Sequence, residues 1–193
     1  ISAGPAVSVH NIPTTEGNPF DDSTHDYFIN PHYKAEIQAS SLTDSEKNVL
    51  SDISSAYWID NIDAISTRDN SFKDALDAAV EQSKSTSKKV TVVFIVYDLP
   101  NRDCKAAASN GEICCDGGNP NPTTGDCSAA SYSGDCTAGL NIYKTQYIDP
   151  IYNLITSSAY SDLELVAIIE PDSLPNGATN LGQRNCTTTT LNA

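Results

Sequence analysis

The apolar residues of this chain gather in short runs, and three of these runs predict strands. KVTVVFIVYD (89–98) is continuous and rich in β-branched residues, which is typical of a parallel strand buried on both faces. LELVAIIE (163–170) has the same character and predicts another buried strand. The shorter AYWI (56–59) predicts the first strand of the chain.

Segments between these runs carry apolar residues at helical spacing. A helix is expected over about 31–52, and an amphipathic helix over about 70–84. Residues 140–158 repeat a bulky apolar side chain every four positions, so they predict a further helix. Pro150 should kink that helix, because proline lacks an amide donor and clashes with the preceding turn. The predicted apolar face of the helix at 70–84 consists of Phe72, Leu76, Ala79 and Val80, and that of the helix at 140–158 consists of Tyr143, Tyr147, Ile151 and Ile155.

Strands and helices alternate along the chain, so the sequence predicts an α/β fold with a parallel sheet and right-handed crossovers. One domain is expected over 18–193, and it opens on NPF (18–20). Residues 1–17 contain Pro, Gly, Ser and Thr without apolar periodicity. We interpret them as a linker remnant or an extended arm.

Residues 111–139 interrupt this alternation. They carry four Cys, six Gly, two Pro and four acidic residues, with no Lys or Arg. This composition predicts no strand or helix of any length, but a long surface loop held by its own disulfides. Four cysteines allow three pairings, and the adjacent Cys114 and Cys115 are expected to bond different partners.

Cysteine usage indicates the compartment. The chain has six Cys, no Met, and one glycosylation sequon at Asn185-Cys186-Thr187. These features favour a secreted, extracellular glycoprotein with three disulfides. The alternative is a zinc site in a cytosolic protein, but the cysteines are not spaced as paired CxxC motifs and no His lies near their cluster.

Charge narrows the class of partner. The formal net charge is −14 with only 11 Lys and Arg, which argues against nucleic acid and against an anionic membrane surface. The apolar runs are too short to span a bilayer. The composition suits a protein that acts on a neutral substrate.

Carboxylates follow two of the predicted strands. Functional groups of parallel α/β folds collect where the chain leaves the carboxyl ends of its strands. If the strands at 89–98 and 163–170 are neighbours, Asp103 and Asp172 can face each other across one cleft. Paired carboxylates are what glycoside hydrolysis requires. The alternative is that both aspartates cap helices or turns.

The motifs at these two exits resemble those of glycoside hydrolase family 6. They are YDLPNRDCKAAASNGE (97–112) and IEPDSLPN (169–176), the latter followed by TNLG (179–182). Earlier pieces that agree are NPF (18–20), the NPHY to AE segment (30–36) and WID (58–60). The resemblance covers most of 18–186 and is closest to the N-terminal half of a cellobiohydrolase-like catalytic domain.

The resemblance implies roles for four residues. Asp172 resembles the general acid. Asp103 resembles the aspartate that favours the protonated form of that acid, because like charges close together raise the pKa of one carboxyl group. The same aspartate helps to take protons from the attacking water. Ser109 matches the serine that holds the chain of catalytic water molecules, and Tyr97 the tyrosine that crowds the sugar ring toward a distorted geometry.

The resemblance also implies substrate contacts. Trp58 matches an aromatic platform for a glucose face, and its alternative is a core position beside the first strand. Asp60 is expected on the same substrate-binding side. Arg102 resembles the arginine that pairs with carboxylates in the site, and its alternative is a surface ion pair. Cys104 and Cys186 match a family disulfide that ties the two catalytic loops, which leaves the other four cysteines to pair within 111–139.

The implied fold is a distorted parallel β/α barrel, TIM-like but with fewer than eight strands, of which this chain supplies only the N-terminal half. The implied reaction is hydrolysis of β-1,4-glucosidic bonds in cellulose with inversion, with no cofactor and no metal. An exo-acting enzyme that releases cellobiose is favoured, because the insertion follows the loop that roofs the site in tunnel-shaped members. The alternatives are an endo-acting glucanase and a non-catalytic carbohydrate-binding relative.

Expected partners are cellulose or cello-oligosaccharides and the remainder of the catalytic domain. Three parallel strands alone would leave unpaired edges and apolar faces exposed. The remainder is therefore expected as a further segment or chain packed against this one.

Overall fold

The computed structural model describes residues 18–21, 23–103, 110–133, 135–173, 175 and 179. No helix among them is long and apolar enough to cross a bilayer. The elements in chain order are β1 (His25–Tyr27), α1 (Pro31–Ala39), α2 (Asp44–Leu50), β2 (Tyr57–Ile59), α3 (Asp63–Ser66), α4 (Phe72–Thr86), β3 (Lys89–Val96), α5 (Ala129–Ser133), α6 (Thr137–Ile142), the π-helix η1 (Tyr143–Ile148), α7 (Asp149–Ile155), the 3-10 helix η2 (Ser158–Tyr160) and β4 (Glu164–Ile169).

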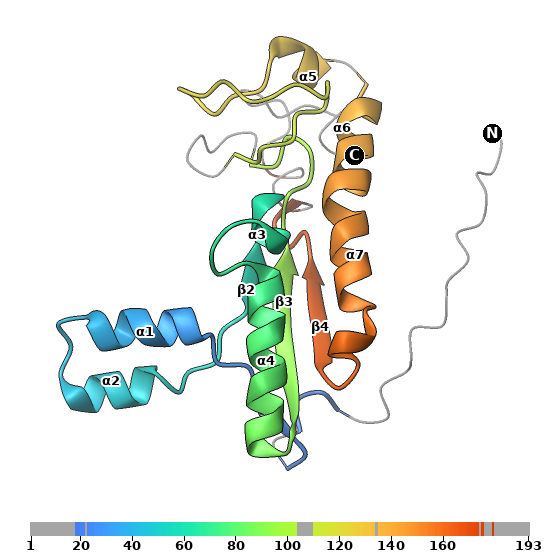
Figure 1. Ribbon diagram of the computed structural model, residues 1–193. Helices are drawn as coiled ribbons and strands as arrows, with labels where there is room; N and C mark the ends of the chain where they lie inside the picture. Colours follow the sequence, from blue (N-terminus) through green and yellow to red (C-terminus); the bar gives the residue numbers. More distant parts are fainter. Residues whose placement is uncertain are drawn as a thin grey trace.

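The four strands form one parallel sheet with β3 at its centre (Figure 1). β1 pairs with the first residues of β3 and β2 with its last residues, both along one edge, while β4 pairs with the opposite edge. The predicted α/β class and parallel sheet are confirmed. The strand predicted as the first of the chain is in fact preceded by β1. The sequence does not predict β1, because it has only three residues and no apolar alternation.

The core lies between the sheet and the helices that cover one of its faces, with β3 and α4 supplying many of its members. Alternate residues of β3 face this helix, and Phe94 contacts Phe72 with ring centroids 4.8 Å apart. Ser71 and Asp74 form a capping box that begins α4, and Ser87 ends it in the left-handed conformation at φ 57°. The predicted face of this helix is confirmed, since three of its four members are buried and Val80 packs against the core.

The prediction of one helix over 31–52 is wrong, because two helices form a hairpin there (Figure 1). The Ser40 hydroxyl donates to the carbonyl of Ile37 and ends α1. Thr43 and Glu46 then form a capping box that starts α2. Cap-forming side chains thus divide the segment into two helices.

Residues 137–155 are continuously helical but change pitch. The expected kink is a π-helical segment, η1, that immediately precedes Pro150. The Asp149 N–H donates to the Lys144 carbonyl, five residues back, so the chain widens before the proline that would otherwise clash with the preceding turn. Tyr147 and Ile151 are buried, as their spacing predicted.

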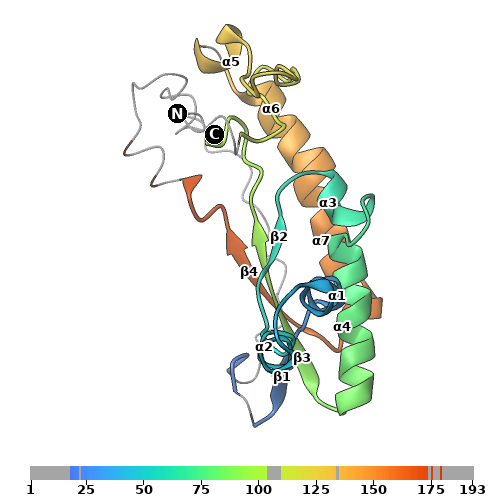
Figure 2. The same ribbon diagram turned by 90° about the vertical axis from the view of Figure 1, so that its left-hand side faces the viewer.

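The prediction that the strand at 163–170 is buried on both faces is wrong for the second half of β4. Ala167, Ile168 and Ile169 are exposed, and Ile169 retains 60% of its accessible surface. α4 and the α6–α7 run lie on one side of the sheet, and no described helix covers the other side (Figure 2). The described sheet is therefore open.

Residues 111–139, hereafter the lobe, lie beyond the carboxyl ends of the strands (Figure 1). Disulfides join Cys114 to Cys127 and Cys115 to Cys136, so the adjacent cysteines bond different partners, as predicted. The zinc alternative is wrong for these four cysteines, because each is in a disulfide. The expectation of no helix is also wrong, since α5 and the start of α6 lie within the lobe.

Candidate active site

The carboxyl ends of β3 and β4 lie side by side, as the predicted cleft requires. Val96 and Ile169 are register partners, and the Glu170 N–H donates to the Val96 carbonyl at 2.8 Å. Beyond them the chain adopts left-handed backbone at three non-glycine residues. These are Asn101 (φ 57°), Asp103 (φ 49°) and Glu170 (φ 44°). Such clustering at strand exits is a feature of functional sites.

Tyr97 is influenced by the charges of both predicted carboxylates. Burial raises the pKa of its hydroxyl well above the ordinary value, and so do a hydrogen bond to Asp103 and the negative charges of Asp103 and Asp172. Asp172 is exposed, whereas Asp103 is half-buried. One aspartate from each strand exit thus acts on the same phenol.

The ring of Tyr97 is fixed from two sides. Trp58 meets it edge-on, with ring centroids 5.6 Å apart and planes at 82°. The Arg102 guanidinium lies over its face, 4.7 Å from the centroid. The backbone N–H of Tyr97 donates to the Tyr147 hydroxyl, which in turn donates to the carbonyl of Ile59. Tyr147 therefore connects the end of β3 to the end of β2.

Trp58 lies on the sheet face that no described helix covers. Its register partner is Ile95, whereas the neighbouring pair of Tyr57 and Phe94 faces α4. The side chain retains 45% of its accessible surface, so the core alternative is wrong. Asp60 follows at the end of β2, half-exposed, and forms an ion pair with Arg68 at 3.2 Å.

Arg102 is a buried residue and not a surface cation, which settles the alternative left open by the sequence. Only 9% of its side chain is exposed, and it faces Asp98, which is fully buried, at 3.7 Å. It also donates to the carbonyl of Tyr97. Burial raises the pKa of Asp98 to about 8; the Arg102 charge opposes this rise, and the negative charges of Glu112 and Glu170 add to it.

Glu170 joins the two strand exits, a role that was not predicted from the sequence. Its Oε1 accepts hydrogen bonds from the Asp98 N–H at 3.0 Å and from the Tyr143 hydroxyl at 2.9 Å. Its Oε2 accepts one from the Ser173 hydroxyl at 3.0 Å. The signal that could have found it is an acidic residue placed directly at the end of a predicted strand, before Pro171.

Some predicted residues lie outside the described part of the chain. These are Ser109, the Cys104 and Cys186 pair, the sequon at Asn185, and the arm at 1–17. The roles assigned to them by resemblance stay predictions.

The sequence profile of glycosyl hydrolases family 6 matches residues 22–122 and 121–192, which together span most of the chain. The chain belongs to glycosyl hydrolases family 6.

The relatives of this family 6 chain include proteins named as exoglucanases, as cellobiohydrolases and as endoglucanases. Exoglucanase A of Cellulomonas fimi is 33% identical over 190 residues, which are 94% of this chain and 19% of that protein. 1,4-beta-D-glucan cellobiohydrolase C of Emericella nidulans is 31% identical over 182 residues, 90% of this chain and 34% of that protein. A putative endoglucanase type B of Fusarium oxysporum is 33% identical over 167 residues, 83% of this chain and 30% of that protein.

Solved structures show the same partial coverage. The catalytic domain of Cellulomonas fimi Cel6B matches with a TM-score of 0.70 and 32% identity, over 90% of this chain and 36% of that one. The CcCel6A catalytic domain, complexed with p-nitrophenyl beta-D-cellotrioside, matches with a TM-score of 0.63 and 31% identity, over 88% and 41%. The chain spans well under half of these domains, and its open sheet matches part of the distorted barrel that the sequence predicted.

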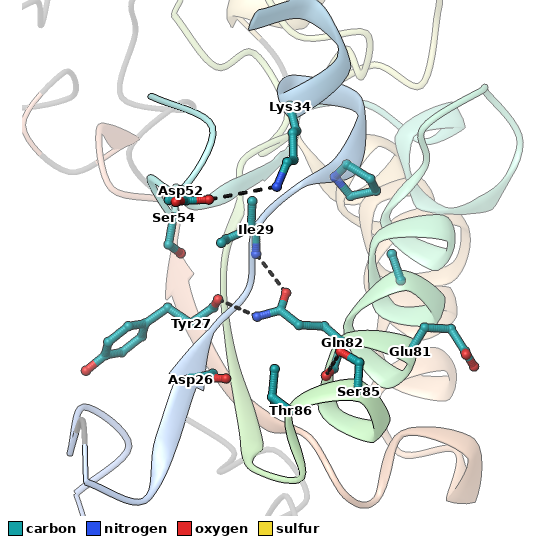
Figure 3. Close-up of a pocket in the computed structure, with 12 residues that line it drawn as sticks. Asp26, Tyr27, Ile29, Lys34, Asp52, Ser54, Glu81, Gln82, Ser85 and Thr86 are labelled. Atoms are coloured by element: carbon teal, nitrogen blue, oxygen red, sulfur yellow. Dashed lines mark hydrogen bonds and ion pairs between the residues drawn. The ribbon is translucent and has the colours of Figure 1, made fainter. Parts of the chain in front are cut away.

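A groove of about 910 Å³ lies elsewhere on this family 6 chain, between β1, the start of α1 and α4 (Figure 3). Gln82 bridges its wall, donating to the Tyr27 carbonyl and accepting from the Ile29 N–H, while Lys34 faces Asp52 at 3.8 Å. β1 pairs with the first residues of β3, so this groove is at the end of the sheet opposite to the paired aspartates. Its size therefore does not identify the active site.

The raised pKa of Asp98 predicts a pH-dependent stability. Its folded pKa of about 8 exceeds the ordinary 3.8, so the folded state holds the extra proton between those values and the free energy of unfolding falls as pH rises through that window. Asp98→Asn should remove this fall, which is on the order of a few kcal/mol. Denaturant unfolding of the complete polypeptide at pH 4, 6 and 8 measures the effect, with Asp162→Asn, an exposed site, as the control. A difference between wild type and variant that is constant over this range would contradict the prediction.

Proposed function

We propose that the polypeptide carrying this chain hydrolyses β-1,4-glucosidic bonds of cellulose with inversion of the anomeric configuration. The observation that carries the proposal is the position of Asp103 and Asp172 at the exits of neighbouring parallel strands, where Asp103 bonds the Tyr97 hydroxyl and the charge of Asp172 also acts on it. Family membership supports it, as do the names of the relatives, which act on 1,4-beta-D-glucan or are exoglucanases and endoglucanases.

Asp172 serves as the general acid and protonates the leaving glycosidic oxygen. Its exposure suits a group that must reach the substrate, whereas the half-buried Asp103 is held by the Tyr97 hydroxyl. Asp103 supports the acid and helps to take protons from the attacking water, with Ser109 holding the water chain. Inversion needs room for that water, so the working carboxyl groups stand about 6.5–9.5 Å apart.

Trp58 supplies the platform for one glucose ring. It is half-exposed on the uncovered sheet face and lies against Tyr97, so a sugar stacked on the indole would be next to the reacting centre. Asp60 extends this side toward the substrate. Arg102 acts from beneath, because its buried guanidinium supports the Tyr97 ring.

The exo mode, with release of cellobiose, is supported by the lobe. Its two disulfides stiffen a segment that begins directly after the roof-loop motif and lies beyond the strand ends. The same disulfides support an extracellular location. An endo mode remains the alternative, and the product pattern distinguishes the two.

The remainder of the catalytic domain packs against the open side of this sheet. The exposed second half of β4 is apolar, and the sheet face bearing Trp58 has no described helix over it. The share of the solved family 6 domains that this chain spans supports the same conclusion.

The test is product analysis of the complete polypeptide on cellohexaose. Proton NMR during the first turnovers should show the α-anomer of the new reducing end, because inversion of a β-linkage produces it. Cellobiose should dominate among the products, whereas a rapid loss of viscosity on soluble cellulose would indicate the endo mode. Release of the β-anomer would rule out inversion, and binding of cellohexaose without turnover would leave only the carbohydrate-binding alternative.

A further inference from the structure

Asn101 connects the lobe to the exit of β3. Asn101 is 4% exposed, and its hydrogen bonds are made to residues of the lobe. Its N–H donates to the Ile113 carbonyl at 2.9 Å, its Oδ1 accepts from the Cys115 N–H at 3.0 Å, and its Nδ2 donates to the Ser131 carbonyl at 2.8 Å. A single buried residue thus joins three points of the lobe.

The chemistry of these contacts selects asparagine. The left-handed φ of 57° is tolerated by Asn better than by most residues. The amide oxygen meets a donor and the amide nitrogen meets an acceptor, so both halves of the group are used. An aspartate of the same shape would keep the bond from Cys115 but would turn a carboxylate oxygen toward the Ser131 carbonyl, leaving two acceptors facing each other in a buried place.

The lobe is stiff at the places that Asn101 touches. Cys115 is bonded to Cys136, and its neighbour Cys114 to Cys127. Ser131 is held by Asp116, whose N–H donates to the Ser131 hydroxyl at 3.1 Å while its carboxylate accepts from it at 2.8 Å. The contacts of Asn101 are therefore made to a cross-linked unit and not to a loose loop.

Asn101 directly precedes Arg102 and Asp103 in the chain. A shift of its backbone moves the guanidinium that supports the Tyr97 ring and the carboxylate that bonds the Tyr97 hydroxyl. Misplacement of a catalytic group by about 1 Å can lower a rate by 10²-fold.

We propose that Asn101 is a positioning residue through which the disulfide-held lobe sets the geometry of Arg102 and Asp103. The lobe then acts on the chemical step as well as on access to the site. This inference rests on the proposed hydrolytic function.

The first test compares two substitutions that each add one negative charge, in the complete polypeptide. Asn101→Asp should lower kcat on cellohexaose by about tenfold and leave KM within about twofold. Asn121→Asp is the control, because Asn121 is exposed in the same lobe and its side chain bonds only through Oδ1, which accepts from the N–H groups of Thr123 and Thr124 and which an aspartate keeps. Its kcat should be that of wild type. If Asn101→Asp does not fold, Asn101→Gly takes its place, since it keeps the left-handed backbone and removes the amide.

The second test measures coupling. Opening the Cys115–Cys136 bridge by replacing both cysteines with serine should also lower kcat, and the loss should not grow further when Asn101→Asp is added, because both changes break the same connection. Losses that multiply, or an Asn101→Asp enzyme with wild-type kcat, would overturn the inference. A wild-type polypeptide inactive on cellohexaose would instead overturn the proposed function.

Discussion

Replacing Asp172 by alanine should lower kcat on cellohexaose by about 10³-fold, within the range that general acid catalysis contributes. The side chain is exposed at the exit of β4, so its loss should cost little folding stability. Binding of cellohexaose, measured by calorimetry, should stay within about twofold, since the substrate platform at Trp58 is untouched.

The leaving group gives the sharper test of this role. An aryl cellobioside with an acidic phenol needs little protonation as it departs, so Asp172→Ala should retain most of its rate on that substrate. Asp162→Ala, an exposed aspartate before β4, is the control and should be normal on both substrates. An equal loss on cellohexaose and on the aryl glycoside would show that Asp172 is not the acid.

Glu170→Gln should lower kcat by about 10²-fold, although Glu170 is not expected to touch substrate. The carboxylate accepts three hydrogen bonds, from the Asp98 N–H, the Tyr143 hydroxyl and the Ser173 hydroxyl. The glutamine amide can present only one oxygen, so either the Asp98 N–H faces an NH₂ group or the Ser173 hydroxyl must turn and accept a hydrogen bond. In both arrangements the carboxylate that holds the three donors is lost. The exits that carry Asp103 and Asp172 would then lose their common anchor.

Tyr143→Phe is the graded control for this prediction, because it removes one of the three bonds and leaves the carboxylate in place. Its kcat should fall by less than that of Glu170→Gln. Kinetics on cellohexaose and thermal unfolding are measured together for both variants. A Glu170→Gln enzyme with a lowered midpoint of unfolding but unchanged kcat would reduce Glu170 to a purely structural role.

The sequence predicted those parts of the fold that depend on apolar runs. The continuous run in β3 and the face of α4 were found, because burial on both faces or on one helical face leaves a period in the chain. The break near Ser40 and the three residues of β1 were missed, because caps and short edge pairings act through hydrogen bonds that leave no such period. The exposure of β4 was missed because it depends on what lies beside the strand.

The residues of the candidate site likewise divide into those that the sequence predicts and those that depend on the folded structure. Asp103 and Asp172 could be found because they follow strands and sit in long motifs. Asp98 and Glu170 stand in the same motifs, but their importance depends on depth and on partners distant in sequence, such as Tyr143. The burial of Arg102 and the exposure of Trp58 were equally undetermined by pattern, since each side chain had two reasonable environments.

The left-handed backbone at Asn101, Asp103 and Glu170 has a consequence for directed evolution. A glutamate in this conformation costs roughly 1–2 kcal/mol relative to ordinary backbone, and glycine would relieve that strain. Glycine at Glu170 would also leave the Asp98 N–H, the Tyr143 hydroxyl and the Ser173 hydroxyl without their acceptor, which offsets the relief of strain. Libraries built to harden such a protein should therefore hold these three positions fixed, because glycine there offers little stability and removes side chains that the site uses.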